Sequence, residues 1–275
     1  MMKLDDVLEI ALFEDLGKLK DITSRAIFND DSRSNALIIA KEGGVISGIH
    51  VVTEVFRKID PSLDVHPLVA DGDLVSPFTE VFVIKGKTIS ILEGERVALN
   101  YLSHLSGIST TVHEYTKAVE GTGVHILDTR KTIPGLRELE KYAVVSGGGK
   151  NHRMGLYDRI LIKDNHIEGA GGIPTAVESV REMYGEDFFI EVEAQTMKEV
   201  EDAIRMRVDR ILLDNMTIPH LREAVRLVNG QIPLEASGNV GLDTVRSIAE
   251  TGVQYISVGA LTLSSKALDL SLRLK

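Results

Sequence analysis

The chain has 275 residues, of which 43% are hydrophobic and 26% are charged, a composition that excludes disordered, collagen-like and coiled-coil proteins. It contains no cysteine, which excludes a disulfide framework, a zinc–thiolate site and a thiol nucleophile. With 31 basic and 41 acidic residues the net charge is −10, which opposes nonspecific binding to nucleic acid or membranes, so an anionic ligand needs a local basic pocket.

The first hundred residues predict a mixed unit of helices and strands. A helix is expected at 4–16, where acidic side chains interrupt the apolar pattern too often for a signal peptide or a membrane span, so we expect a cytoplasmic protein. An amphipathic stretch predicts a helix at 51–59, and apolar or alternating runs predict strands at 36–41, 63–69, 80–84 and 88–92. This pattern is typical of a small antiparallel sheet with helices on one face, an α+β sandwich.

A long helix is predicted at 95–119, and it ends at a pair of glycines and joins two domains. Beyond it, short β-rich runs alternate with amphipathic helices, which predicts parallel βαβ units. The strands are expected at 124–127, 159–162, 188–192, 210–213, 232–234 and 254–258.

Polar residues follow nearly every one of these strands, as in the sequences DTRK at 128–131 and SGN at 237–239. In a doubly wound sheet the site gathers at one crevice, whereas in a β/α barrel all strand ends face one mouth, so the pattern favours a barrel. Only six strands are recognised rather than eight. Either the barrel is incomplete or two strands escape the pattern.

Basic residues concentrate at 128–163, where eight of them stand against four acidic residues. The charged residues of 137–141 fall in one helical stretch and are expected on a solvated helix surface. Five others fall in glycine-rich loops or at strand ends, where we expect a pocket for a ligand with several anionic groups; structural ion pairs are the alternative. These five are Arg130, Lys131, Lys150, Arg153 and Lys163.

Two short patterns in this part of the chain fail as motifs. The glycine run before Lys150 lacks the Ser or Thr that a nucleotide-binding loop needs after its lysine. His152 and His166 have no second histidine or cysteine at ligand spacing, so no zinc site is expected.

Two acidic residues, Glu193 and Asp214, stand where core strands end, and there they need Lys163, a sugar hydroxyl or a cation as a partner. Pairing with Lys163 alone is the plainer alternative. Glycine-containing loops at 237–239 and 258–260 follow the last two strands, a common place for phosphate in barrels, although they also fit plain turns. Together these features indicate a sugar-phosphate enzyme with a highly charged substrate.

At this point a resemblance becomes specific. The segments ILDTRKTIPGLR at 126–137, GGGKNHRMGLYD at 147–158 and LIKDNHI at 161–167 resemble the quinolinate phosphoribosyltransferase family, also called carboxylating nicotinate-nucleotide pyrophosphorylase. The similarity extends to 94–102, 190–193, 213–215, 257–260 and 267–272, and so covers nearly the whole chain.

The resemblance implies an α/β protein with an N-terminal α+β open-faced sandwich and a C-terminal open, incomplete β/α barrel. We place the sandwich at 1–104 and the barrel, with its phosphate site, at 105–264, and expect the tail at about 265–275 to return to the sandwich. The implied reaction joins quinolinate and phosphoribosyl pyrophosphate to give nicotinate mononucleotide, pyrophosphate and CO₂ in NAD biosynthesis. Mg²⁺ is implied as cofactor, with no organic cofactor, as is a homodimer with shared active sites; assembly beyond the dimer stays open.

The resemblance also implies roles for individual residues. It places Lys131, Lys163, Glu193 and Asp214 in catalysis, with Mg²⁺ near Glu193 and Asp214. Substrate binding is expected at Arg96, Arg130, Lys131, His152, Arg153, Lys163, Glu193, Asp214, Ser237, Gly238 and Gly259.

Two other readings stay open from the sequence. One is a phosphoribosyltransferase of similar fold that acts on a different acid, such as the paralogue associated with molybdate transport or an enzyme that uses nicotinate. The other is a non-enzymatic protein that binds a phosphate ligand.

Overall fold

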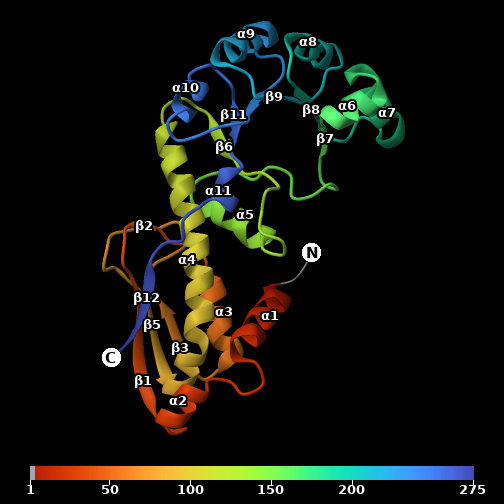
Figure 1. Ribbon diagram of the computed structural model, residues 1–275. Helices are drawn as coiled ribbons and strands as arrows, with labels where there is room; N and C mark the ends of the chain where they lie inside the picture. The colour runs from red at the N-terminus through yellow and green to blue at the C-terminus, as the bar shows by residue number, and fades with distance from the viewer. Residues whose placement is uncertain (1–3) are drawn as a thin grey trace. The chain divides into compact units, whose positions relative to one another are not determined.

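The computed structural model describes residues 4–275, which form two compact units. The first unit comprises the chain up to His113 together with Thr132–Gly148 and Leu261–Lys275, and the second comprises Glu114–Lys131 and Gly149–Ala260. The chain is a mixed α/β protein, with a small antiparallel sheet in the first unit and a parallel sheet in the second (Figure 1).

The sheet of the first unit has the strand order β12-β1-β5-β3 and is antiparallel throughout. Figure 1 shows α1, α3 and α4 gathered on one side of this sheet. Its strands are β1 (Arg33–Ala40), β3 (Asp64–Pro67), β5 (Glu80–Lys87) and β12 (Leu270–Leu274), and a separate pair is formed by β2 (Gly44–Val45) and β4 (Leu74–Val75). Its helices are α1 (Leu4–Leu16), α2 (Ile22–Ile27), α3 (Ile49–Ile59), most of α4 (Thr88–Ala118) and α5 (Arg137–Ser146), and α11 (Ala260–Leu263) begins at its boundary.

The strand predicted at 88–92 is wrong, because these residues form the first turns of α4. The apolar side chains of Ile89 and Ile91, two residues apart, imitate the period of a strand. Both are buried, at 7% and 0% exposure, so the start of α4 packs on more than one side.

The second unit contains a parallel sheet with the strand order β6-β11-β10-β9-β8-β7. All six predicted strands are confirmed: β6 (His125–Leu127), β7 (Ile160–Ile162), β8 (Ile190–Ala194), β9 (Arg210–Asp214), β10 (Leu234–Ser237) and β11 (Tyr255–Ser257). The two outer strands, β6 and β7, do not pair with each other within the described chain, so the barrel is open, as expected.

Helices connect these strands, and two of them begin at threonine caps. They are α6 (Asp164–Ala170), α7 (Ile173–Tyr184), α8 (Met197–Arg205), α9 (Ile218–Val228) and α10 (Val245–Ala249). Thr196 and Glu199 form a capping box at the start of α8, and the Thr217 hydroxyl accepts the His220 N–H at the start of α9. Figure 1 shows α8 and α9 on the outer side of the row of strands. Among residues 4–275, no helix is both long and apolar enough to cross a membrane.

Candidate active site

One face of the parallel sheet is polar, and we call it the polar face. Residues two apart in a strand share a face, and residues paired between parallel strands share it too. The polar face carries Lys163 after β7, Glu191 and Glu193 on β8, Arg210 and Asp214 on β9, and Glu235 and Ser237 on β10. The residues between them, such as Val192, Leu213 and Ala236, are buried and apolar. β8, β9 and β10 thus each supply one polar side chain at the carboxyl end and one deeper in the sheet, and β7 supplies Lys163 at its end.

The structure brings two of the expected site residues together at the carboxyl end. The Lys163 ammonium lies 3.2 Å from a carboxylate oxygen of Glu193, so the ion pair considered from the sequence is present. The Lys163 side chain is 48% exposed, whereas that of Glu193 is 7% exposed. On the neighbouring strand, the Asp214 carboxylate accepts from the amides of Asn215 and Gln195, at 2.9 and 3.4 Å.

The loops after β10 and β11 come close to their neighbours. Gly238 has a φ of +95°, and a Cβ there would lie 2.1 Å from the Asn215 side-chain oxygen, so only glycine fits. The Asn239 amide donates to that same oxygen at 3.0 Å, which ties this loop to the one after β9. At Gly259 a Cβ would lie 2.8 Å from the aliphatic chain of Lys131. Lys131 therefore lies across the turn that contains Gly259.

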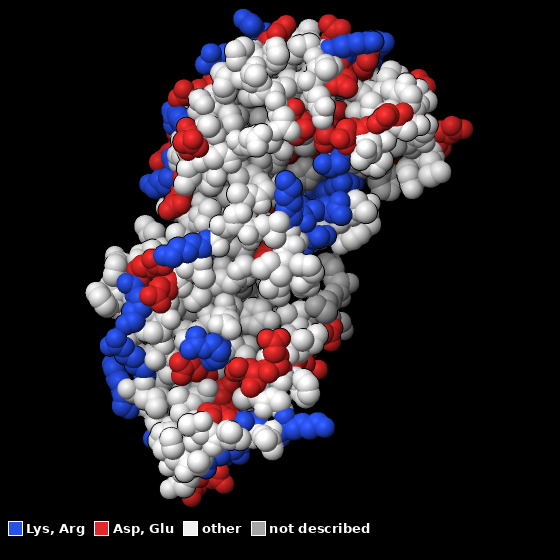
Figure 2. All heavy atoms as spheres, in the orientation of Figure 1, with Lys and Arg blue, Asp and Glu red and all other residues white. Residues whose placement is uncertain are grey.

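Two guanidinium groups lie near each other beside this edge. Arg153 is 6% exposed, and burial lowers its pKa; the positive charge of Arg130 lowers it further. Figure 2 shows basic side chains gathered at one place on the second unit. Two neighbouring cations that partly leave water repel each other, and an anion placed between them removes that repulsion.

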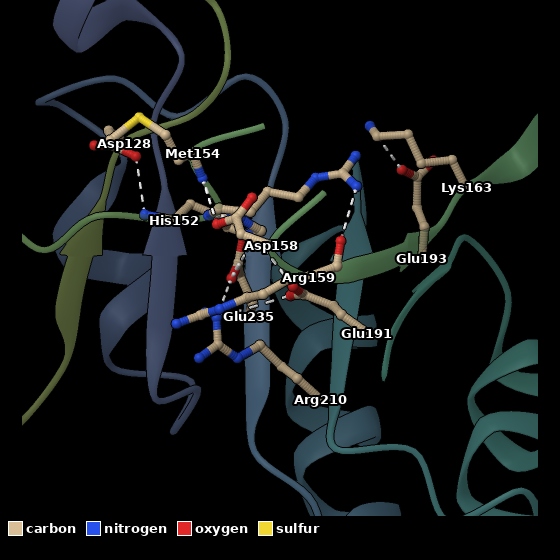
Figure 3. A network of polar contacts seen from close by, with 11 residues as sticks. Asp128, His152, Met154, Asp158, Arg159, Lys163, Glu191, Glu193, Arg210 and Glu235 are labelled. Atoms are coloured by element: carbon tan, nitrogen blue, oxygen red, sulfur yellow. Dashed lines mark hydrogen bonds and ion pairs between the residues drawn. The ribbon is translucent and has the colours of Figure 1, made fainter. Parts of the chain in front are cut away.

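The ring of His152 points into the sheet, toward two buried acids (Figure 3). Its Nε2 lies 3.1 Å from Glu191 and 3.6 Å from Glu235, and both glutamates are fully buried. We call Glu191 and Glu235 the buried acid pair. Arg210 joins them, with its guanidinium 3.0 Å from Glu235 and 3.9 Å from Glu191. That guanidinium also lies 4.0 Å over the ring of Tyr255.

Burial sets the charge state of the buried acid pair. Desolvation first, and then the negative charge of Glu191, raise the pKa of Glu235 to about 7. Desolvation also raises the pKa of Glu191, against the opposing effect of Arg210. The pair therefore holds a proton between its two carboxyl groups at a pH where surface glutamates are ionised.

These residues also offer metal-ligand atoms. One donor atom each from His152, Glu191 and Glu235 lies within 4.8 Å of the others. Arg210 contacts both acids and already supplies the positive charge that a metal ion would bring. We therefore assign no metal to this cluster. Sequence reasoning named His152 but missed Glu191 and Glu235, which lie far apart in the chain. The available signal was the two-residue spacing from Glu191 to Glu193 and from Glu235 to Ser237.

Two predictions concern the first unit. Arg96 lies exposed on α4. The solvated surface expected at 137–141 is wrong for Glu140 and Lys141, which are fully buried in α5. Glu140 is buried because its carboxylate contacts the His104 ring at 2.8 Å and accepts the Ile133 N–H at 3.2 Å.

An open β/α barrel that presents bases, carboxylates and glycine loops at its carboxyl edge is suited to an enzyme that acts on a phosphorylated sugar. Comparison with known proteins narrows this class. The family models for the N-terminal and C-terminal domains of quinolinate phosphoribosyl transferase match residues 21–106 and 108–273. The chain therefore belongs to the quinolinate phosphoribosyltransferase family of enzymes, which confirms the resemblance seen in the motifs.

Individual relatives agree with this assignment. A mitochondrial quinolinate phosphoribosyltransferase [decarboxylating] 2b from Nicotiana tabacum is 44% identical over 98% of this chain and 82% of its own length. A probable nicotinate-nucleotide pyrophosphorylase [carboxylating] from Synechocystis is 42% identical over 98% of this chain and 92% of its own length. The crystal structure of NadC from Streptococcus pyogenes superimposes with a TM-score of 0.96 at 38% identity, covering 99% and 96% of the two chains.

Proposed function

We propose that the carboxyl end of the parallel sheet is where this chain transfers the phosphoribosyl group from phosphoribosyl pyrophosphate to quinolinate, with loss of CO₂. The observation that carries this proposal is the gathering of Lys163, Glu193, Asp214 and Ser237 at one edge of the polar face. Family membership supplies the reaction, and the arrangement of charges supports this location for it.

Quinolinate is assigned to the basic residues Arg130 and Arg153. Each guanidinium can hold a carboxylate in a two-pronged arrangement. A dianion offsets both the burial and the repulsion from Arg130 that lower the pKa of Arg153. His152 is assigned beneath this position, because its ring nitrogens contact Glu191 and the Arg153 backbone N–H. We assign His152 the role of supporting Arg153, in place of the direct substrate contact that the resemblance implies.

The ribosyl half is assigned to the carboxylates. Breaking the bond between ribose C1 and pyrophosphate develops positive charge on the sugar, which Glu193 and Asp214 stabilise. The 5′-phosphate is assigned to the loops that contain Ser237, Gly238 and Gly259, where close neighbours require glycine or a small residue. Lys131 lies across Gly259 and is assigned to the anionic groups of phosphoribosyl pyrophosphate.

Decarboxylation then follows from the chemistry of the substrate. The ring nitrogen of quinolinate attacks ribose C1 as pyrophosphate leaves, and the ring becomes a cationic pyridinium. The adjacent carboxylate departs as CO₂, its bonding electrons stay on the ring carbon, and that carbon takes up a proton. Because the positive charge on the adjacent ring nitrogen stabilises this electron pair, no organic cofactor is required.

Mg²⁺ completes the proposal. The carboxylate oxygens of Glu193 and Asp214 are the ligand type that Mg²⁺ prefers, so the residues present fit this ion when it arrives with phosphoribosyl pyrophosphate. When bound, Mg²⁺ neutralises negative charge on the pyrophosphate. We further assign a homodimer in which the partner subunit's Arg96 completes each site, and we retain the cytoplasm as the expected location.

The test is turnover with two acids. Purified enzyme with phosphoribosyl pyrophosphate and quinolinate should release CO₂ and form nicotinate mononucleotide. Nicotinate lacks one carboxylate and would leave a buried cation unmatched, at a cost of about 3–5 kcal/mol or roughly two to four decades in efficiency. Equal efficiency with both acids would contradict the assignment of Arg130 and Arg153, and ligand-induced stabilisation without pyrophosphate release would contradict catalysis.

A further inference from the structure

The segment that carries Arg153 has no regular secondary structure, yet side chains accept its backbone N–H groups one after another. His152 N–H donates to Asp128 at 2.9 Å, and Arg153 N–H donates to the His152 Nδ1 at 2.7 Å. The next two N–H groups, of Met154 and Gly155, both donate to the Asp158 carboxylate. Two aspartates and one histidine therefore accept the backbone N–H groups that carbonyl oxygens of a neighbouring strand accept in a sheet.

The second of these bonds fixes the protonation of His152. A ring nitrogen that accepts a hydrogen bond carries no proton, so in the neutral ring the proton is on Nε2. Nε2 lies 3.1 Å from a carboxylate oxygen of Glu191, and the negative charge of that carboxylate favours the proton on Nε2. A second proton, on Nδ1, would point at the Arg153 N–H, so two donors would face each other and the hydrogen bond would be lost. The geometry thus selects one tautomer of a ring that is 8% exposed.

Glu191 is itself held in place by Arg210, which lies deeper in the sheet. Its carboxylate faces the Arg210 guanidinium at 3.9 Å, and Arg210 lies over the rings of Tyr255 and Phe189 at 4.0 and 5.4 Å. Glu191 stands two residues before Glu193 on the same face of β8. A contact chain therefore runs from the rigid sheet through Glu191 and His152 to the backbone of Arg153.

We propose that Glu191 is a positioning residue that holds His152 in its Nε2–H tautomer, so that Nδ1 fixes the backbone of Arg153 for the dicarboxylate substrate. This inference rests on the proposed function, since it takes Arg153 to bind quinolinate. Glu191 contacts no substrate in this scheme. Its effect is transmitted through the 3.1 Å contact with Nε2 on one side of the His152 ring and through the hydrogen bond that Nδ1 accepts on the other side.

A double-mutant cycle tests whether Glu191 acts through Arg153. Calorimetry should show quinolinate binding weakened about tenfold in Glu191→Gln, with the KM for phosphoribosyl pyrophosphate changed less than about twofold. In an Arg153→Lys background, Glu191→Gln should add less than about a further twofold. If the losses of quinolinate binding caused by Glu191→Gln and by Arg153→Lys multiply in the double variant, the two residues act independently and the proposal is overturned. If Arg153→Lys leaves quinolinate binding intact, the assignment of Arg153 to quinolinate is wrong. If Arg153→Lys weakens quinolinate binding but Glu191→Gln leaves it intact, only the positioning role of Glu191 is wrong.

A matched control separates positioning from stability. Glu140→Gln disrupts another fully buried glutamate that contacts a histidine, in the first unit. Circular dichroism should show a lower thermal midpoint for both glutamine variants, whereas only Glu191→Gln should weaken quinolinate binding. Equal changes in binding for the two variants would overturn the proposal.

Two variants of the histidine test the relay even if Glu191→Gln folds poorly. Asparagine places its oxygen where Nδ1 lies and can still accept the Arg153 N–H, whereas glutamine reaches toward Glu191 and leaves that N–H without this acceptor. We expect His152→Asn to bind quinolinate at least about fivefold more tightly than His152→Gln. The opposite order would overturn the proposal, as would nitrogen NMR that shows a proton on Nδ1 of His152 in the wild-type protein at neutral pH.

Discussion

Glu235 shows how one buried side chain couples stability to pH. In the folded chain its pKa is about 7, whereas the ordinary value is 4.5. Folded Glu235 therefore binds a proton more tightly than unfolded Glu235, so the associated stability is full below about pH 4.5 and is lost as the pH rises to about 7. Each pH unit within that window costs about 1.4 kcal/mol.

Glu235→Gln should remove this dependence. Between about pH 5 and pH 8, the unfolding free energy of the wild type should fall by about 2–3 kcal/mol more than that of the variant. Denaturant unfolding at a series of pH values measures both slopes. The exposed Glu178 on α7 provides the control, as Glu178→Gln. Parallel curves for wild type and Glu235→Gln would show that Glu235 is ionised at the same pH in both states.

The two carboxylates at the sheet edge allow a second prediction at this scale. Glu193→Gln or Asp214→Asn should lower kcat by about two decades or more, because each removes charge stabilisation that is needed only in the transition state. Quinolinate binding, measured by calorimetry, should stay nearly unchanged. Loss of quinolinate binding together with turnover would move these residues to the acid-binding half of the site.

Residue patterns explain which site positions the sequence reveals. Glu193 and Asp214 are recognisable because each stands at the end of an apolar run, where a charge needs a partner. Glu191 and Glu235 are not recognisable, because a charged residue within a predicted strand is expected to face solvent. Their two-residue spacing to Glu193 and Ser237 shows that they share a face with those residues, but whether that face is covered depends on the rest of the fold.

At the scale of elements, the six strands of the second unit are predictable because each is a short apolar run with turn residues after it. The start of α4 is not predictable in this way, because Ile89 and Ile91 have the spacing of a strand although both are buried in a helix. The prediction that Glu140 and Lys141 lie on a solvated helix surface is wrong for a related reason. Charges three or four apart on a helix normally face water, but here tertiary contacts bury them.

Helix α4 also allows a prediction about packing against the C-terminal segment. A Cβ on Gly107 would lie 2.2 Å from the Lys266 carbonyl oxygen and 2.9 Å from the Ala267 Cα, both backbone atoms that cannot rotate away. Gly107→Ala should lower the unfolding free energy by about 1–3 kcal/mol, although alanine favours helix by about 1 kcal/mol. Denaturant unfolding measures the change.

Gly169 in α6 is the matched control. No atom lies within 4 Å of a Cβ placed there, so Gly169→Ala should raise the unfolding free energy by up to about 1 kcal/mol. If both substitutions stabilise the protein, α4 and the C-terminal segment are not in close contact. If both destabilise it, helix propensity does not govern α6.

At the scale of the whole molecule, the proposed dimer makes a prediction about mixed subunits. Arg96→Ala and Lys163→Ala should each be nearly inactive, since the first removes an anion-binding group and the second a cation at the sheet edge. In a two-fold dimer that shares its sites, a mixed pair collects both defects in one site and none in the other. Random 1:1 reassembly should therefore restore about a quarter of wild-type activity.

Subunit exchange in this experiment is verified with two affinity tags on the two variants. Activity at the level of the parents, in samples where doubly tagged dimers are present, would show that Arg96 serves the site of its own chain. A homodimer could still form in that case, but each subunit would work alone.

The pairing of β12 with β1 has a consequence for the order in which this protein matures. β1 lies between β12 and β5, so until residues 270–274 arrive one edge of β1 has no partner. The chain leaves the ribosome N-terminus first, so the whole second unit is synthesised before this strand. The part made first is therefore completed last, and during synthesis it exposes a strand containing the apolar run Leu37–Ile39 to other nascent chains.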